Sequence, residues 1–219
     1  GTVVSPDALV NDYGCDSLRM YELFVGPPEL DAEWDDRGID GVNRFLKRLW
    51  NLLMDSKEAD VQPTKEMIKL RHKMVYDITN RLESFSLNTV ISGFMEYNNK
   101  FIEMAKKEGG IDKETLETIA VLLSPFAPHF AEEMWEQLGH GETIFKAGWP
   151  SYDESAMKDD EIEVPVQING KTRAVISISA DASKDEAIAA GKEAVADKLT
   201  GTIVKEIYVP KKIINIVQK

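Results

Sequence analysis

The feature that most constrains the fold of this chain is a change in its hydrophobic period near residue 161. Before that point, apolar residues recur at the spacing i, i+3, i+4 and i+7, which is typical of amphipathic helices packed on a core. After it, the segment EIEVPVQINGKTRAVISIS alternates between apolar and polar residues, as a half-buried strand does. The sequence therefore predicts an antiparallel α-helical bundle followed by a small α+β domain.

Four or five amphipathic helices are predicted between residues 39 and 145, joined by short connections that favour antiparallel neighbours. The first has the apolar face Val42, Phe45, Leu46, Leu49, Trp50 and Leu53. The second has the apolar face Met67, Leu70, Met74, Ile78 and Leu82. The third is marked by Leu87, Ile91, Phe94, Phe101 and Ile102. Asp112 is expected to cap the N-terminus of a fourth helix.

An earlier helical stretch is predicted near Pro6 to Leu23, with Ser5 as its cap and Pro6 in its first turn. It contains Cys15, the single cysteine of the chain, which we interpret as a small packed residue rather than a nucleophile. The polar segment ELDAEWDDRGIDG follows. Residues 1–38 therefore resemble the edge of a larger folded structure more than a domain with its own core.

Residues 122–139, LLSPFAPHFAEEMWEQLG, are predicted to form two helices joined by a corner. Ser124 precedes a proline and is expected to leave the helical region, which ends the first of the two helices. Pro128 suits the first turn of the second helix, and Gly139 is expected to close it.

Three side chains after the corner, His129, Glu132 and Glu133, have the i, i+3, i+4 spacing of metal ligands or of an acid–base pair. We favour a structural interpretation, because no second His-x-x-Glu occurs and the helix dipole already favours glutamates in a first turn. The chain also lacks a glycine-rich phosphate loop and an H-E-x-x-H motif. We therefore expect no catalytic residue, metal or cofactor in it.

The formal net charge of −12 argues, taken alone, against a nucleic acid partner. Residues 40–81, however, contain nine Lys and Arg against six Asp and Glu, a net of +3. Opposite the apolar face of the first bundle helix lie Arg44, Lys47 and Arg48. Opposite that of the second lie Lys65, Lys69, His72 and Lys73. Each basic face is either a phosphate-binding surface or merely a solvated one.

The small domain is predicted to have the order ββαββ. Asn169-Gly170 favours a two-residue turn that pairs residues 168 and 171, but that register would split the apolar face. We therefore expect a three-residue loop or a bulge that pairs 168 with 172 and sets Gln167 beside Arg173. Ser183 and Glu186 form a capping box for a helix through Ile188, Val195 and Leu199, and VKEIYVP with IINIVQ gives a second hairpin.

Several segments together resemble one enzyme family. LLSPFAPHFAEEMWEQLG resembles the helix-corner-helix signature of the anticodon-binding bundle of class I aminoacyl-tRNA synthetases. The segment VPVQINGKTR, with a ββαββ pattern that ends in IYVPKKIINIV, is similar to the C-terminal domain of bacterial leucyl-tRNA synthetases. Two departures are Cys15 for the family's usual alanine and Pro210-Lys211-Lys212 for a Pro-Gly-Lys turn. The likeness covers essentially the whole chain.

The resemblance implies a division into a tail of the catalytic core (1–38), an anticodon-binding bundle (39–152), a flexible acidic linker (153–160) and a tRNA-binding domain (161–219). GTVVSPD would follow the KMSKS loop, so the ATP-binding and editing domains would lie upstream. The parent enzyme would use ATP and Mg²⁺ to attach leucine to tRNA(Leu). This piece would bind the body of that tRNA through the two basic faces, and its elbow and variable arm through Asn169, Lys171 and Arg173.

Two alternatives remain open from the sequence. Valyl and isoleucyl enzymes share the bundle, but the former usually end in a coiled coil and the latter in a metal-binding segment, and neither heptads nor cysteine pairs occur here. The chain could instead be a helical module with a ubiquitin-like tail that binds protein. The single cysteine and the absence of an apolar run near ~18 residues favour a cytoplasmic protein without a membrane span. We expect it to be a monomer.

Overall fold

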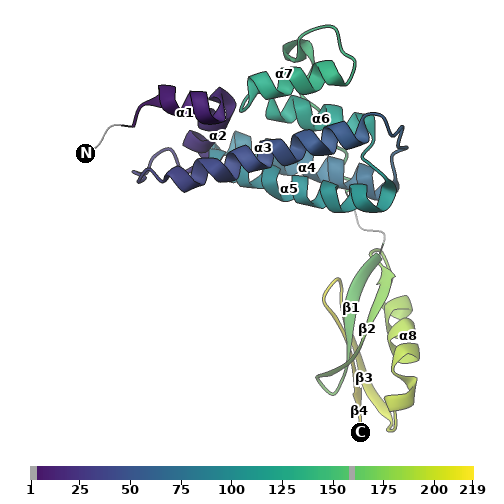
Figure 1. Ribbon diagram of the computed structural model, residues 1–219. Helices are drawn as coiled ribbons and strands as arrows, with labels where there is room; N and C mark the ends of the chain where they lie inside the picture. The colour runs from purple at the N-terminus through teal and green to yellow at the C-terminus, as the bar shows by residue number, and fades with distance from the viewer. Residues whose placement is uncertain (1–3, 158–160) are drawn as a thin grey trace. The chain divides into compact units, whose positions relative to one another are not determined.

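The computed structural model describes residues 4–157 and 161–219. The chain forms two compact units, one that ends at Met157 and one that begins at Lys158. The first is helical, and the second is a sheet with helix α8 packed against it (Figure 1). The boundary falls in the segment predicted as a linker, of which residues 158–160 lie outside the described residues. Among the residues described, no helix is long and apolar enough to cross a membrane.

The helical unit consists of α1 (Pro6–Tyr13), α2 (Cys15–Phe24), α3 (Asp36–Ser56), α4 (Lys65–Glu83), α5 (Leu87–Glu108), α6 (Lys113–Leu123) and α7 (Pro128–Gln137). A short 3-10 turn at Ile144–Lys146 follows α7. Helices α3, α4 and α5 are long and lie side by side, with α5 in contact with the other two (Figure 1). The predicted α-helical bundle is therefore confirmed, with α3 to α7 as its helices.

The apolar face of α3 is buried much as its spacing predicts. Val42 and Leu53 are 0% exposed, whereas Trp50, at the edge of the face, is only half-buried. Burial of a side chain of this size stabilises the fold by about 1.5–3 kcal/mol. Asp112 caps α6 as predicted, because its carboxylate accepts the Thr115 N–H at 3.0 Å.

The helix predicted over residues 6–23 is in fact two helices, α1 and α2, which meet at Gly14. Gly14 has φ 85° and ψ 157°, a conformation that residues with side chains rarely adopt. Its N–H bonds the Val10 carbonyl at 2.9 Å and ends α1. Cys15 therefore begins α2 and is exposed, so its interpretation as a packed residue is wrong. Ser5 precedes α1, but its side chain makes no capping hydrogen bond.

Helix α2 enters the core of the helical unit through Met20 and Tyr21, which are 0% and 2% exposed. The Tyr21 hydroxyl donates to the Asp35 carbonyl at 2.6 Å, which holds the ring in place. Gly38, in the first turns of α3, lies against that ring, and a Cβ added there would meet Tyr21 Cε2 at 2.3 Å. The close approach of α2 to α3 therefore requires a glycine at this position.

Gly38→Ala should lower the free energy of unfolding by about 1–3 kcal/mol, because the added methyl forces the buried Tyr21 ring to move. Gly41→Ala is the matched control, since a Cβ at Gly41 in the same helix would meet nothing within 4 Å. That control should stabilise the helix by about 0.5–1 kcal/mol. Urea unfolding followed by circular dichroism measures both. Equal stability of the two variants would contradict the close approach.

The corner between α6 and α7 forms differently from the prediction. Helix α6 ends at Leu123 with Ser124 as its C-cap, as predicted, but Ser124 keeps helical angles, φ −55° and ψ −34°, so its expected departure from the helical region is wrong. The Phe126 and Ala127 N–H groups both bond the Leu123 carbonyl at 2.9 Å and wind the chain through one further turn. The break comes at Ala127, which precedes Pro128 and has φ −131° and ψ 72°. Gly139, at φ 94°, closes α7 as predicted.

The small unit contains β1 (Glu161–Ile168), β2 (Lys171–Ser179), α8 (Lys184–Ala194), β3 (Ile203–Val209) and β4 (Ile213–Gln218). The predicted ββαββ order is confirmed. The strands lie in the order β2-β1-β4-β3, with β1 parallel to β4 and both hairpins antiparallel. The Ser183–Glu186 capping box forms. Helix α8 ends at Ala194, earlier than predicted, and the 3-10 turn Ala196–Lys198 follows.

The first hairpin combines a two-residue turn with a bulge. Asn169 and Gly170 have φ 49° and 79°, and Ile168 pairs with Lys171, so the predicted pairing of 168 with 172 is wrong. The register shifts between Val166 and Gln167, because Gln167 pairs with Thr172 and Val166 with Ala174. Arg173 is the extra residue of this bulge rather than the partner of Gln167. The bulge restores the apolar face that a regular ladder would have split.

Candidate nucleic-acid interface

The three predicted cations of α3 form one exposed face. Arg44, Lys47 and Arg48 are all exposed, on the side of the helix opposite its buried residues. Within the residues that the structure describes, none of the three makes a hydrogen bond or an ion pair. A hydrogen bond from Lys106 lowers the pKa of Glu103, and Arg48 contributes to that shift only through its charge. The face can therefore accept an external anion without breaking an internal ion pair.

The four predicted residues of α4 are engaged within the protein. Lys69 pairs with Glu66 at 2.8 Å, and Lys65 and Lys73 also take part in interactions within the chain. His72 accepts the Asp153 N–H through Nδ1 at 3.0 Å. This face is therefore less free to bind phosphate than the face on α3.

A segment that we call the strap, residues 149–153, occupies the outer side of α4. Trp149 Nε1 donates to Thr79 Oγ1 at 3.0 Å, and the Tyr152 ring packs edge-to-face on Tyr76 with centroids 5.1 Å apart. These contacts, with the one at His72, follow the i, i+4, i+7 spacing of a single helical face. Residues 153–157, part of the predicted linker, form hydrogen-bonded turns at the end of the strap.

His129, Glu132 and Glu133 each have a partner within the protein. His129 Nδ1 lies 2.9 Å from Asp16 Oδ1. Glu132 accepts the Ile144 N–H at 3.1 Å and the Thr143 hydroxyl, and Glu133 accepts Gln137 Nε2 at 3.0 Å. No group of three or more His, Cys, Asp or Glu side chains able to hold a metal occurs in the described part of the chain.

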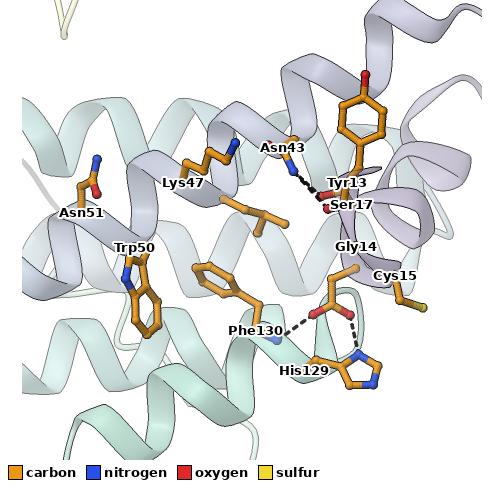
Figure 2. A pocket seen from close by; sticks show the side chains of 12 residues that line it. Tyr13, Gly14, Cys15, Ser17, Asn43, Lys47, Trp50, Asn51, His129 and Phe130 are labelled. Carbon is orange, nitrogen blue, oxygen red and sulfur yellow. Dashed lines mark hydrogen bonds and ion pairs between the residues drawn. The ribbon is translucent and has the colours of Figure 1, made fainter. Parts of the chain in front are cut away.

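A pocket of about 460 Å³ opens where the α1–α2 junction, α3 and α7 meet (Figure 2). Its apolar wall includes Leu46, Trp50 and Phe130, and the Trp50 and Phe130 rings pack edge-to-face with centroids 5.8 Å apart. Lys47 and Asn51 line it from the same helix as Trp50. Sequence reasoning missed this pocket, because its walls come from three segments that lie about 30 to 115 residues apart in the chain, as the numbering shows.

All three predicted residues at the β1–β2 hairpin are exposed. The Asn169 side-chain amide already donates to the Gln218 carbonyl at 3.1 Å and accepts the Gln218 N–H at 2.9 Å. These two hydrogen bonds hold the turn against β4. Lys171 and Arg173 are exposed, and their side chains make no hydrogen bond or ion pair within the described residues.

Comparison with known families decides what kind of domain carries these features. The family model for the anticodon-binding domain of tRNA ligase matches residues 64–188. The chain belongs to this family. The match begins before α4 and continues through β1 and β2 into α8, so it takes in parts of both units of this anticodon-binding domain.

Relatives that match this chain include leucine–tRNA ligases. That of Fervidobacterium nodosum is 45% identical over 236 residues, covering 100% of this chain and 29% of the relative. That of Phocaeicola vulgatus is 42% identical over 222 residues, covering 98% of this chain and 23% of the relative. The chain thus spans less than a third of the length of these curated relatives.

A solved structure is similar in fold to this chain. It is the crystal structure of the ternary complex of Agrobacterium radiobacter K84 agnB2 LeuRS, tRNA and LeuAMS. The TM-score is 0.78 and the sequence identity 25%, with 99% of this chain and 30% of that chain covered. The relatives and this structure agree with the family that the sequence resembles.

Proposed function

We propose that this chain is the tRNA-binding part of a leucine–tRNA ligase and that its partner is tRNA(Leu). The observation that carries the proposal is the face of Arg44, Lys47 and Arg48, exposed and without an internal ion pair in the described residues of an anticodon-binding domain. Support for leucine comes from relatives named leucine–tRNA ligases, which match this chain over 98–100% of its length.

The mode of binding that the charges favour is contact with the RNA backbone. Lysine and arginine on a helix neutralise phosphates, and helical RNA is recognised mostly by its shape and backbone rather than its base sequence. The α3 face would meet the body of the tRNA, and Lys171 and Arg173 would meet its elbow and variable arm. Lys65, Lys69 and Lys73 would take part only where RNA displaces their present contacts.

The whole enzyme would attach leucine to tRNA(Leu) with ATP and Mg²⁺, bound by catalytic and editing domains elsewhere in the same chain. The present chain covers 23–29% of the relatives' length, which leaves room for such domains. The residues described here would supply no catalytic group and no cofactor site. We place the enzyme in the cytoplasm, as a monomer.

A gel-shift titration of the chain against tRNA(Leu) and an unrelated tRNA tests the proposal. We expect saturable binding that is tighter for tRNA(Leu) and that weakens linearly in log affinity against log salt, as phosphate contacts do. Equal binding of both RNAs would contradict the assignment to leucine. Absence of binding to either would contradict the proposed function as a whole.

Removal of the small unit should weaken binding of tRNA(Leu) by about 100-fold, the low end of the gain that linkage of two binding modules gives. A chain that ends at Met157 is suitable, because each unit has its own core. Lys171→Ala with Arg173→Ala, in the whole chain, should weaken binding less than this removal. If the shortened chain bound tRNA(Leu) as tightly as the whole chain does, the small unit would have another role.

A further inference from the structure

The pocket between α2, α3 and α7 is lined by aromatic and polar side chains, most of which take no part in the proposed contacts with the RNA backbone. Trp50 and Phe130 are among its lining residues and are only half-buried, so part of each ring remains open to a ligand (Figure 2). A volume of about 460 Å³ lies within the range of roughly 300–1,000 Å³ typical of small-ligand pockets. An open aromatic wall of this size suits a planar ring system.

The polar groups of the pocket lie beside that aromatic wall. Lys47, Trp50 and Asn51 stand at i, i+3 and i+4 on α3, so their side chains are neighbours on one patch of the helix. Lys47 carries a positive charge, and Asn51 offers an amide with two donors and an acceptor. Asn51 is exposed, and its side chain makes no hydrogen bond within the residues described.

His129 adds a third polar group, and a buried carboxylate orients it. Asp16 is 8% exposed; its Oδ2 accepts the Phe130 N–H at 2.6 Å, and its Oδ1 faces His129 Nδ1 at 2.9 Å. Because an ionised carboxylate can only accept, Nδ1 carries the proton. The other ring nitrogen is left for a ligand, and the His129 side chain is 75% exposed.

We propose that this pocket receives an unpaired nucleotide of the bound tRNA, its base against Trp50 and Phe130 and its phosphate at Lys47. A cation, an open aromatic wall and an amide are the groups with which proteins hold unstacked RNA bases. A nucleotide within an RNA chain fits better than a free one, because Lys47 also belongs to the α3 face, whose Arg44 and Arg48 would hold the adjoining phosphates. The inference rests on the proposed function.

Cys15 supplies a reporter for this site. It is the single cysteine of the chain, it is exposed, and it lines the pocket. Its alkylation by iodoacetamide should slow several-fold when the chain is saturated with tRNA(Leu). A blunt RNA duplex of similar length offers phosphates but no unpaired nucleotide, so at saturation it should leave the alkylation rate nearly unchanged.

Trp50→Leu should weaken tRNA(Leu) binding about tenfold, within the range for loss of one base–aromatic stack. Trp149→Leu is the matched control, because Trp149 is also partly exposed but lies outside the pocket, against Thr79. Should Trp50→Leu fail to fold, as judged by circular dichroism, Asn51→Ala replaces it; we expect that exposed variant to bind about threefold more weakly and to restore part of the Cys15 alkylation rate.

The outcomes separate this inference from the proposed function. Normal salt-dependent binding of tRNA(Leu) with unchanged Cys15 alkylation, and pocket variants that bind like the Trp149 control, would overturn the pocket and leave the function standing. Protection of Cys15 by millimolar AMP but not by tRNA would overturn the assignment to RNA. Complete absence of tRNA binding would overturn both.

Discussion

Replacing Arg71 with methionine should lower the free energy of unfolding of the helical unit by about 3 kcal/mol, the low end of the effect expected for breaking a buried ion pair. Arg71 is 7% exposed, and its Nη1 lies 3.4 Å from Asp112 Oδ1 and 2.9 Å from Glu114 Oε2. Asp112 is 2% exposed. Without Arg71, this buried carboxylate keeps its hydrogen bonds to Thr115 but loses its counter-charge.

Thermal unfolding followed by circular dichroism at 222 nm should show a midpoint lower by roughly 6–12 °C, at about 2–4 °C per kcal/mol for a chain of this size. Glu114→Gln is the control, because the Glu114 side chain is 68% exposed and an exposed pair contributes at most about 1 kcal/mol. Asp112→Asn added to Arg71→Met should recover part of the loss, since asparagine also caps helices. A loss for Arg71→Met no larger than for Glu114→Gln would contradict the buried pair.

Local signals were enough to predict the bundle, two of the helix caps and the small domain. The apolar face of α3, the Asp112 cap and the Ser183–Glu186 capping box involve residues only a few positions apart, so their spacing is visible in the sequence. The strand alternation also identified Val164, Val166 and Ile168 as core residues of the small domain. Each of these features follows from one helix or one strand and its nearest neighbours.

The features that escaped prediction depend on contacts between distant segments or on a choice between close alternatives. Arg71 stands inside the apolar stripe of α4, a local anomaly, but its partner Asp112 lies 41 positions away. The helix break fell at Gly14 rather than at a proline, and Ser124 tolerated the helical region that a following proline only disfavours. The hairpin took the favoured two-residue turn and corrected its face with a bulge at Arg173, where the sequence had presented these as competing solutions.

At the candidate interface, too, local spacing predicted some features, and contacts between distant segments determined the others. The spacing on α3 correctly predicted that Arg44, Lys47 and Arg48 are exposed, because the buried stripe determines the opposite face. On α4 the same reasoning could not foresee the strap, which comes from residues 70 to 81 positions further along the chain. Exposure is thus predictable from one helix, whereas freedom from internal partners requires the tertiary structure.

Replacing Arg44, Lys47 and Arg48 together with alanine should weaken binding of tRNA(Leu) by about 100-fold at low salt, taking ~1 kcal/mol for each phosphate contact. The slope of log affinity against log salt should fall by about 1 for each phosphate that is no longer neutralised, hence by roughly 3. All three side chains are exposed, so the fold should be unaffected. The two effects must appear together, since both arise from the release of counterions that the phosphates had held.

The matched control removes Lys106, Lys113 and Lys146, surface lysines of the same unit that pair with Glu103, Glu117 and Glu142. Both triple variants change the net charge of −12 by the same three units, to −15. A general electrostatic effect would therefore weaken binding equally in the two variants, whereas specific phosphate contacts would affect only the α3 variant. If the α3 variant kept the salt slope of the unmodified chain, the face would be merely solvated, and the tRNA would have to be held by other cations, such as the exposed Lys171 and Arg173.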